Sequence, residues 1–127
     1  MRTICFSITA LSVLLFGLSA CKKDCTTDAP VIAVTSPLEG SSVQLPDSVH
    51  LAGTISDDVW LKSAAVIITN HNGDTVFNTQ PDVYGKKTHD FTYNYFTSAS
   101  GTFHLQVSAE DNEGQKAMKE AMFTVLP

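Results

Sequence analysis

The sequence predicts an all-β fold, in the form of one antiparallel β-sandwich of about seven strands. Two observations lead to this prediction. Runs rich in β-branched and aromatic residues alternate apolar with polar positions, and turn residues interrupt them at intervals of roughly ten residues. In addition, no segment after Pro30 shows a sustained helical period of about 3.6 residues.

The first three predicted strands are defined by alternation and by the turn residues that end them. Val31 to Thr35 is followed by proline and glycine within residues 36–40, which terminate strand pairing. In Val49 to Ser56, every second residue belongs to a face that we expect in the core: Val49, Leu51, Gly53 and Ile55. Leu61 to Thr69 is so rich in Ala, Val and Ile that we expect it to be buried on both faces.

The remaining four strands follow from hairpin and turn signals. Asn72-Gly73 favours a tight hairpin, so Thr75 to Gln80 is the expected return strand. The other three predicted strands are His89 to Phe96, with aromatic residues at alternate positions, Gly101 to Glu110, and Gln115 to Leu126. The turn Asp111 to Gly114 joins the last two.

Length and charge limit the class of protein. The 127 residues suit a single compact domain after a short leader. The chain has 13 acidic and 8 basic residues, and loss of a leader containing Arg2 leaves 7 bases and a formal charge of −6. This acidic balance argues against a nucleic-acid partner, because phosphate binding needs a basic face.

The N-terminus resembles a bacterial lipoprotein signal. One basic residue, Arg2, precedes a mostly apolar run from Ile4 to Leu18, and the run closes on Leu18-Ser19-Ala20-Cys21, which resembles a lipobox. The run is short for a membrane span, because Ser, Thr and Gly interrupt it. We therefore expect residues 1–20 to be a signal peptide, 21–29 a lipidated tether, and 30–127 the β-sandwich.

The three cysteines have separate expected fates. Cys5 leaves with the signal peptide, and Cys21 is the expected site of thioether lipidation and membrane attachment through acyl chains such as palmitate. Cys25 then remains as the one free thiol, so we expect no disulfide within the mature chain. An intermolecular bridge through Cys25 and an idle exposed thiol both stay open. The tether Lys22-Lys23-Asp24 is similar to export signals of Bacteroidota lipoproteins.

Four strings resemble bacterial immunoglobulin-like domains of the fibronectin-III and cadherin-like kind. They are SPLEG at 36–40, GTISDDVWLKS at 53–63, GTFHLQVSAEDNEG at 101–114 and FTVLP at 123–127. The chain is most similar to a family of small Bacteroidota lipoproteins of unknown function. The resemblance implies an immunoglobulin-like sandwich over most of 30–126. It also implies a place in the bacterial cell envelope, and we expect the outer membrane, at its periplasmic or surface face.

An immunoglobulin-like topology brings the loop after the second predicted strand and the loop before the last one to the same end of the sandwich. The polar residues gathered there are Asp57, Asp58, Glu110, Asp111, Asn112 and Glu113. Oxygen ligands from two loops suit calcium, and Asp57, Asp58, Asp111, Asn112 and Glu113 are the candidate ligands. The alternative is that Asp57 and Asp111 cap turns by accepting backbone hydrogen bonds.

A second candidate metal site, for zinc or copper, uses histidines. His50, His71 and His104 are expected toward the opposite end, with Asp47 or Asp74 as a further ligand. Isolated surface histidines are also ordinary in strands, so the spacing alone does not distinguish the two interpretations.

Trp60 is the only tryptophan and lies between the acidic turn and the third strand. It either covers the open end of the core or forms an exposed platform for a sugar or peptide, with Tyr84 as a second contact.

We expect no enzyme, because no Gly-x-Ser-x-Gly elbow occurs. The expected function is a lipid-anchored binding or structural module for a protein or glycan, through Asp57, Asp58, Trp60, Asp111 and Asn112. A metal-binding envelope lipoprotein is the alternative.

Overall fold

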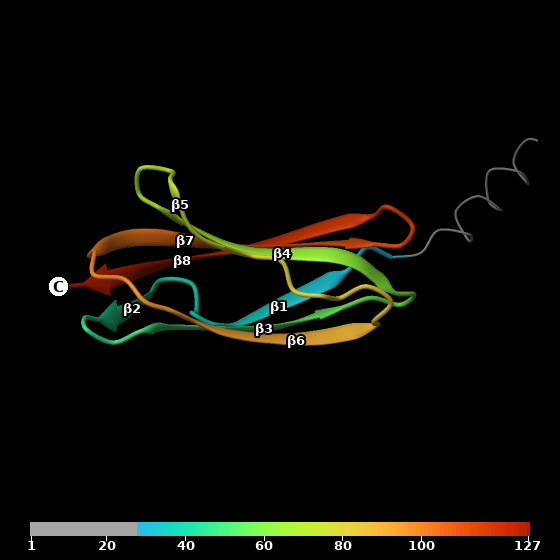
Figure 1. Cartoon of the computed structure of the whole chain (residues 1–127), viewed down its shortest axis with the longest axis horizontal. Coiled ribbons are helices and arrows are strands. Elements are labelled where there is room, and N and C mark those ends of the chain that lie inside the picture. Colours follow the sequence, from blue (N-terminus) through green and yellow to red (C-terminus); the bar gives the residue numbers. More distant parts are fainter. Residues whose placement is uncertain (1–27) are drawn as a thin grey trace, which may run out of the picture.

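The computed structural model describes residues 28–127, which form a two-layer β-sandwich (Figure 1). Its strands are β1 (Val31–Ser36), β2 (Ser41–Gln44), β3 (Val49–Ser56), β4 (Leu61–Asn70), β5 (Thr75–Thr79), β6 (Thr88–Tyr95), β7 (Gly101–Asp111) and β8 (Lys116–Leu126). Residues 28–127 contain no helix that is long and apolar enough to cross a membrane. The predicted signal peptide, Cys21 and Cys25 lie outside the described residues.

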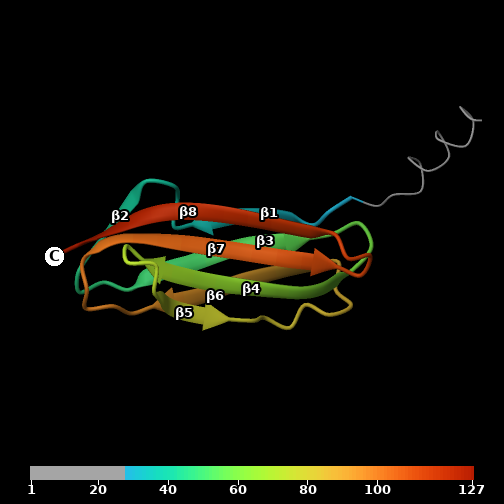
Figure 2. The same cartoon turned by 90° about the horizontal axis from the view of Figure 1, so that it is seen from above.

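The two layers are a three-stranded and a five-stranded sheet (Figure 2). The smaller sheet has the order β1-β3-β6 and the larger one β2-β8-β7-β4-β5. The all-β sandwich is therefore confirmed, and the seven expected strands are all present. The expectation of seven strands in wholly antiparallel pairing was incomplete. An additional short strand, β2, pairs with β8 in parallel. In this pair Ser41 lies opposite Phe123, and Gln44 lies opposite Leu126.

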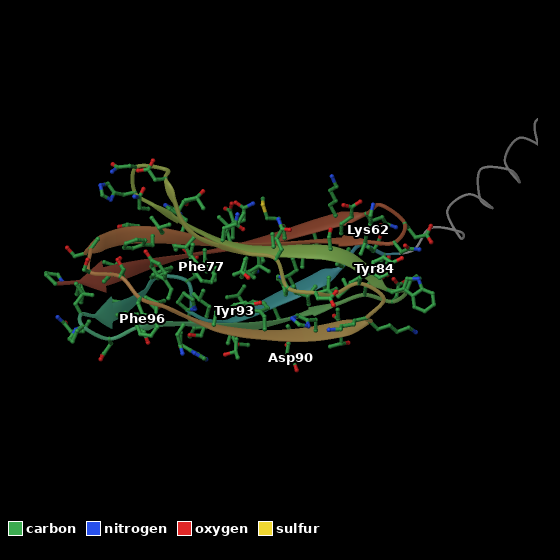
Figure 3. All side chains as sticks on the ribbon, viewed as in Figure 1. Lys62, Phe77, Tyr84, Asp90, Tyr93 and Phe96 are labelled. Atoms are coloured by element: carbon green, nitrogen blue, oxygen red, sulfur yellow. The ribbon has the colours of Figure 1, made fainter. Side chains whose placement is uncertain are left out.

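The core lies between the sheets and follows the predicted period of two. Its buried apolar residues are Val49, Leu51, Ile55, Leu61, Ala64, Val66, Ile68, Val83, Phe91, Tyr95, Phe103, Leu105, Val107, Ala109, Ala121, Phe123 and Val125. Phe77 of β5 and Tyr93 of β6, labelled in Figure 3, close one side, with ring centroids 5.9 Å apart. Burial of these side chains is the main stabilising contribution to the fold.

The prediction that β4 is buried on both faces was wrong. Ala64, Val66 and Ile68 are buried, whereas Ala65 and Ile67 are only half-buried on the outer face of the larger sheet. Ala65 and Ile67 stay partly exposed because no second layer of described residues packs over that face.

The sandwich has two ends, which we name by their residues. The Trp60 pole comprises residues 57–61, 82–87 and 111–115, at the right of Figure 1, where β1 also begins. The opposite pole comprises residues 45–48, 71–74 and 96–100, and the C-terminus lies at that end. Because Val31 pairs with Ser56, the chain enters the sandwich beside the turn that carries Asp57.

Candidate functional site

The Trp60 pole is held together by backbone hydrogen bonds between three segments that are distant in sequence. The amide of Leu61 donates to the carbonyl of Lys86 at 2.8 Å, and the amide of Gly85 donates to the carbonyl of Leu61 at 3.0 Å. The third segment joins through the amide of Asn112, which donates to the carbonyl of Trp60 at 3.0 Å. These bonds fix the backbone positions from which the side chains of the pole project.

The loop at 82–87 is anchored by one buried side chain and displays the next. Val83 is 1% exposed and belongs to the core, while Tyr84 is 73% exposed (Figure 3). Gly85 has a φ of 75°, a region in which residues with a Cβ are disfavoured. The turn closes through the amide of Lys86, which donates to the carbonyl of Val83 at 3.0 Å, so Tyr84 stands at a fixed tip.

A hollow of about 310 Å³ lies between these segments. It is lined by Trp60, Leu61, Tyr84, Gly85 and Asn112. Trp60 is 47% exposed, and it is not part of the buried core cluster. Trp60 is therefore half-exposed at the end of the sandwich, and its role as a platform or as a cover for the core stays a prediction.

The predicted acidic residues do meet at this pole, and their hydrogen bonds are those of turn caps. A carboxylate oxygen of Asp57, Oδ2, accepts from the amide of Val59 at 2.9 Å. Asp111 is fully buried, and its Oδ1 accepts from the amides of Glu113 and Gln115, each at 2.8 Å. The turn-capping alternative is thus confirmed for Asp57 and Asp111. Their other oxygens, Asp57 Oδ1 and Asp111 Oδ2, are buried and receive no hydrogen bond from the described residues.

The remaining polar candidates of the pole face solvent. Asp58, Asn112 and Glu113 are exposed, whereas Asp111 is fully buried at the end of β7, opposite Leu61 of β4. Asp111 and its exposed neighbours therefore do not converge as a ligand set. Across residues 28–127, no group of three or more His, Cys, Asp or Glu side chains is placed to hold a metal ion.

The histidines lie toward the opposite pole but on different faces, contrary to the expectation that all three collect. His50 is on the outer face of the smaller sheet, where its Nδ1 lies 3.2 Å from Asn94 Oδ1. His104 is on the outer face of the larger sheet and pairs with Thr69 and Met122. His71 lies in the β4–β5 turn near Gly101. The alternating direction of side chains places the core between His50 and His104.

A larger and shallower depression, of about 650 Å³, lies on the outer face of the larger sheet. Small side chains, including Ser63, Ala65 and Ser108, contribute to its lining, and Glu110 and Lys116 also line it. Beside it, Lys62 Nζ lies 3.5 Å from Glu110 Oε1. Such an exposed ion pair stabilises little. The lining of the depression is mostly apolar and includes Ala65, Ala117 and Met118.

Comparisons with known proteins support the fold and do not define a family. No family model and no curated protein matches the chain. Among solved structures, 44 chains match. The fibronectin(III)-like modules of CbhA from Clostridium thermocellum have a TM-score of 0.52 at 14% identity, over 75% of this chain and 94% of that one. CopC from Methylosinus trichosporium OB3b has a TM-score of 0.51 at 15% identity, over 76% and 95%.

Two further structures extend this picture. The CARDB domain of the PF1109 protein from Pyrococcus furiosus, solved in complex with di-metal ions, has a TM-score of 0.50 at 15% identity, over 80% of this chain and 92% of that one. An engineered protein has a TM-score of 0.57 at 14% identity, and the match covers 80% of this chain but 21% of the engineered one. At these identities the likeness shows the fold alone, so the immunoglobulin-like sandwich is confirmed.

Part of the pole was not predicted from the sequence. The core role of Val83 and the placement of Gly85 against Leu61 were missed, because residues 81–87 contain no alternation that marks a buried position. A weak signal does exist, since the apolar pair Val83-Tyr84 stands between polar residues and is followed by glycine. That pattern is typical of a loop with one inward and one outward side chain.

Proposed function

We propose that this protein is a lipid-anchored, non-catalytic module of the bacterial cell envelope, attached through Cys21 and making its binding contact through the Trp60 pole. The single observation that carries the proposal is the position of that pole. The start of β1, reached from the lipobox-like sequence, lies at the same end of the sandwich as the exposed side chains of Trp60 and Tyr84. Anchor and contact surface would therefore face the same way.

The non-catalytic part of the proposal rests on how the inner space is filled. Apolar side chains occupy the region between the sheets, and among the described residues Asp111 is the one buried charged side chain. Its Oδ1 is used by the turn that follows β7. A deep polar pocket, which most catalytic sites need, has no space between these two sheets.

Lipid attachment is tested by labelling cells with tagged palmitate and isolating the protein. We expect the wild-type protein to carry the label and Cys21→Ser to lose it, because the thioether requires the cysteine sulfur. Cys25→Ser is the matched control, and it should retain the label. Equal labelling of the wild-type protein and Cys21→Ser would contradict the anchor, as would loss of the label in Cys25→Ser alone.

The metal-binding alternative has no specific observation in its favour beyond fold likeness. The solved CARDB domain contains metal ions, but that match shows the architecture and not a ligand set. The described residues present no group suited to a metal. We therefore propose the contact surface of the Trp60 pole as the functional site.

A further inference from the structure

We infer that the partner of the Trp60 pole is the phospholipid surface of the membrane in which the protein is anchored. This inference rests on the proposed function, because it uses the lipid at Cys21 to hold the domain close to the bilayer. It adds a direction: the Trp60 pole faces the membrane, and the opposite pole, with residues 71–74 and 96–100, faces away.

Only a short stretch of sequence separates the expected lipid from the sandwich. Cys21 and Pro30 are nine residues apart, and an extended chain of that length spans at most about 30 Å. Pro30 is buried at the start of the sandwich, and Val31 pairs with Ser56 at the edge of the pole. A lipid on Cys21 thus keeps this end of the domain within about 30 Å of the headgroups. The tether therefore holds the pole close to the bilayer, which raises the effective concentration of lipid at the pole.

The exposed side chains at this end of the sandwich have the chemistry of a membrane interface. At the pole, Trp60 is 47% and Tyr84 is 73% exposed, and Val31, which begins β1 beside the pole, is 65% exposed. Trp and Tyr are the residues enriched at membrane interfaces, because each combines an apolar ring with a polar group that stays hydrated. Single exposed apolar residues are ordinary, but Trp60 and Tyr84 line one hollow at the end that carries the tether, and together they form a surface suited to headgroups.

The two aromatic side chains of the pole project from a preorganised backbone. Trp60 and Tyr84 are attached to segments tied by the hydrogen bonds between Leu61, Lys86 and Gly85. Val83 is locked in the core directly before Tyr84. Their backbone positions are therefore already fixed in the free protein. Binding then costs less conformational entropy than it would for aromatic residues on a free loop.

The lining of the hollow at Trp60 fits a lipid surface better than a glycan. A sugar site needs several convergent polar groups beside its aromatic platform. The hollow at Trp60 is lined by one amide side chain, Asn112, and one phenol, Tyr84, with Leu61 and Gly85 completing it. This sparse set of polar groups fits an interface with mobile headgroups better than it fits one defined sugar ring.

The charges around the pole indicate which lipids it suits. Lys86 and Lys87 are exposed beside Tyr84, and the exposed carboxylates of Asp58, Asp82 and Glu113 lie on the same pole. Both signs are thus present, and a net basic patch for anionic lipids is not. We expect contact with zwitterionic phospholipid, and we expect it to persist when salt is raised, because it depends on the aromatic side chains.

Trp60 provides the test, because it is the only tryptophan of the chain. The lipidated mature protein, expected to begin at Cys21, is reconstituted in phosphatidylethanolamine and phosphatidylcholine vesicles, some with acyl chains brominated close to the headgroup. We expect Trp60 emission to shift to the blue and to lose intensity with the brominated lipid. Its quenching by aqueous iodide should fall relative to the Cys21→Ser protein without vesicles.

The matched control moves the tryptophan to the opposite pole. Phe96 is 75% exposed there (Figure 3), so the double variant Trp60→Phe with Phe96→Trp reports on that end. We expect that brominated lipid does not quench the emission of this variant and that aqueous iodide still quenches it. Equal quenching of both proteins would overturn the inference, because the domain would then have no preferred direction.

The outcomes separate the inference from the anchor on which it rests. A protein that does not float with vesicles refutes lipid attachment and, with it, the inference. A protein that floats while Trp60 stays unquenched by brominated lipid overturns the inference and leaves the anchor intact. A Trp60 signal that responds to soluble envelope glycan fragments, and not to brominated lipid, would overturn it in favour of a sugar.

Discussion

Replacement of Gly53 by alanine tests the packing between the edge strand and the core of the smaller sheet. A Cβ at Gly53 would lie 2.4 Å from the carbonyl oxygen of Ala33 and 2.6 Å from Cζ of Phe91. Gly53 pairs directly with Phe91 of β6 and with Val34 of β1, so the ring covers the bare backbone of the glycine. No rotamer relieves the contact with Ala33, because that atom belongs to the backbone.

The expected loss of stability follows from two opposing terms. Overpacking of a dense core costs up to about 3 kcal/mol. Alanine also lowers the entropy of the unfolded chain, which returns about 0.5–1 kcal/mol. Gly53→Ala should therefore lower the free energy of unfolding by about 2 kcal/mol, or the melting midpoint by about 8–16 °C. Urea unfolding followed by circular dichroism gives the first value.

Two further variants show whether the reasoning is right. Phe91→Leu removes the ring atoms that a new Cβ would meet, so Gly53→Ala should cost less in that background than in the wild-type protein. Gly73→Ala has no atom within 4 Å of the new Cβ and a φ of 86°, so it should show only backbone strain of about 1 kcal/mol. A Gly53→Ala protein within about 0.5 kcal/mol of the wild type would refute the account.

Three other changes follow from the structure of the Trp60 pole. Asp111→Ala should lower the free energy of unfolding by about 2–3 kcal/mol in urea, because the part-buried amides of Glu113 and Gln115 both lose their carboxylate acceptor; an unchanged midpoint would contradict the turn-capping role. Val83→Ala should cost about 1–3 kcal/mol, since it leaves a gap where the 82–87 loop is anchored, and a neutral result would show that the loop is not held there. Tyr84→Ala should change stability by less than about 0.5 kcal/mol, because the side chain is exposed, while reducing the quenching of Trp60 by brominated lipid. Thermal unfolding with chelator, calcium or zinc should give one common midpoint, and a metal-specific rise that chelator reverses would restore the metal-binding alternative.

The fold could be predicted from the sequence because most strands carry their own evidence. In β3, the alternation of Val49, Leu51 and Ile55 with polar residues identifies both the strand and its inner face. The Asn72-Gly73 pair identifies the β4–β5 hairpin, in which Gly73 indeed has a positive φ. Local patterns of this kind do not depend on any distant part of the chain, so one sequence is enough to detect them.

Strand β2 was missed for the opposite reason. Its four residues, Ser41–Gln44, include a single apolar side chain, Val43, which is too little to show a period. The strand exists because its backbone pairs with β8, some eighty residues later in the chain. Such non-local pairing leaves no mark in the local sequence, and the same holds for the parallel direction of the pair.

The candidate site was predicted in part, for a similar reason. Trp60, Asp57 and Asp111 were placed at one end because an assumed topology brings their loops together. The capping role of the two aspartates depends on local turn chemistry, which the sequence does show. The hollow at Trp60 depends on Tyr84 and Gly85 meeting Leu61, and that contact requires the path of a loop with no periodic pattern.

The histidine expectation shows where face assignment matters. His50, His71 and His104 do lie toward one end, but His50 belongs to the smaller sheet and His104 to the larger one. Both are exposed, on outer faces that point in opposite directions. It is thus not enough to know at which end of the sandwich a residue lies, because the sheet and the face on which it lies decide which side chains can meet. Lipidation of Cys21 and placement in the envelope stay predictions.

The orientation of the domain on its membrane can be measured most directly by hydroxyl-radical footprinting. Trp60 and Tyr84 report on the Trp60 pole, Phe96 on the opposite pole and Met118 on the outer face of the larger sheet; all four side chains are exposed. In vesicle-bound lipidated protein, oxidation of Trp60 and Tyr84 should fall relative to the Cys21→Ser protein in solution, while oxidation of Phe96 and Met118 stays the same. Unchanged oxidation of Trp60 and Tyr84, or protection of Phe96 in their place, would contradict a membrane-facing Trp60 pole.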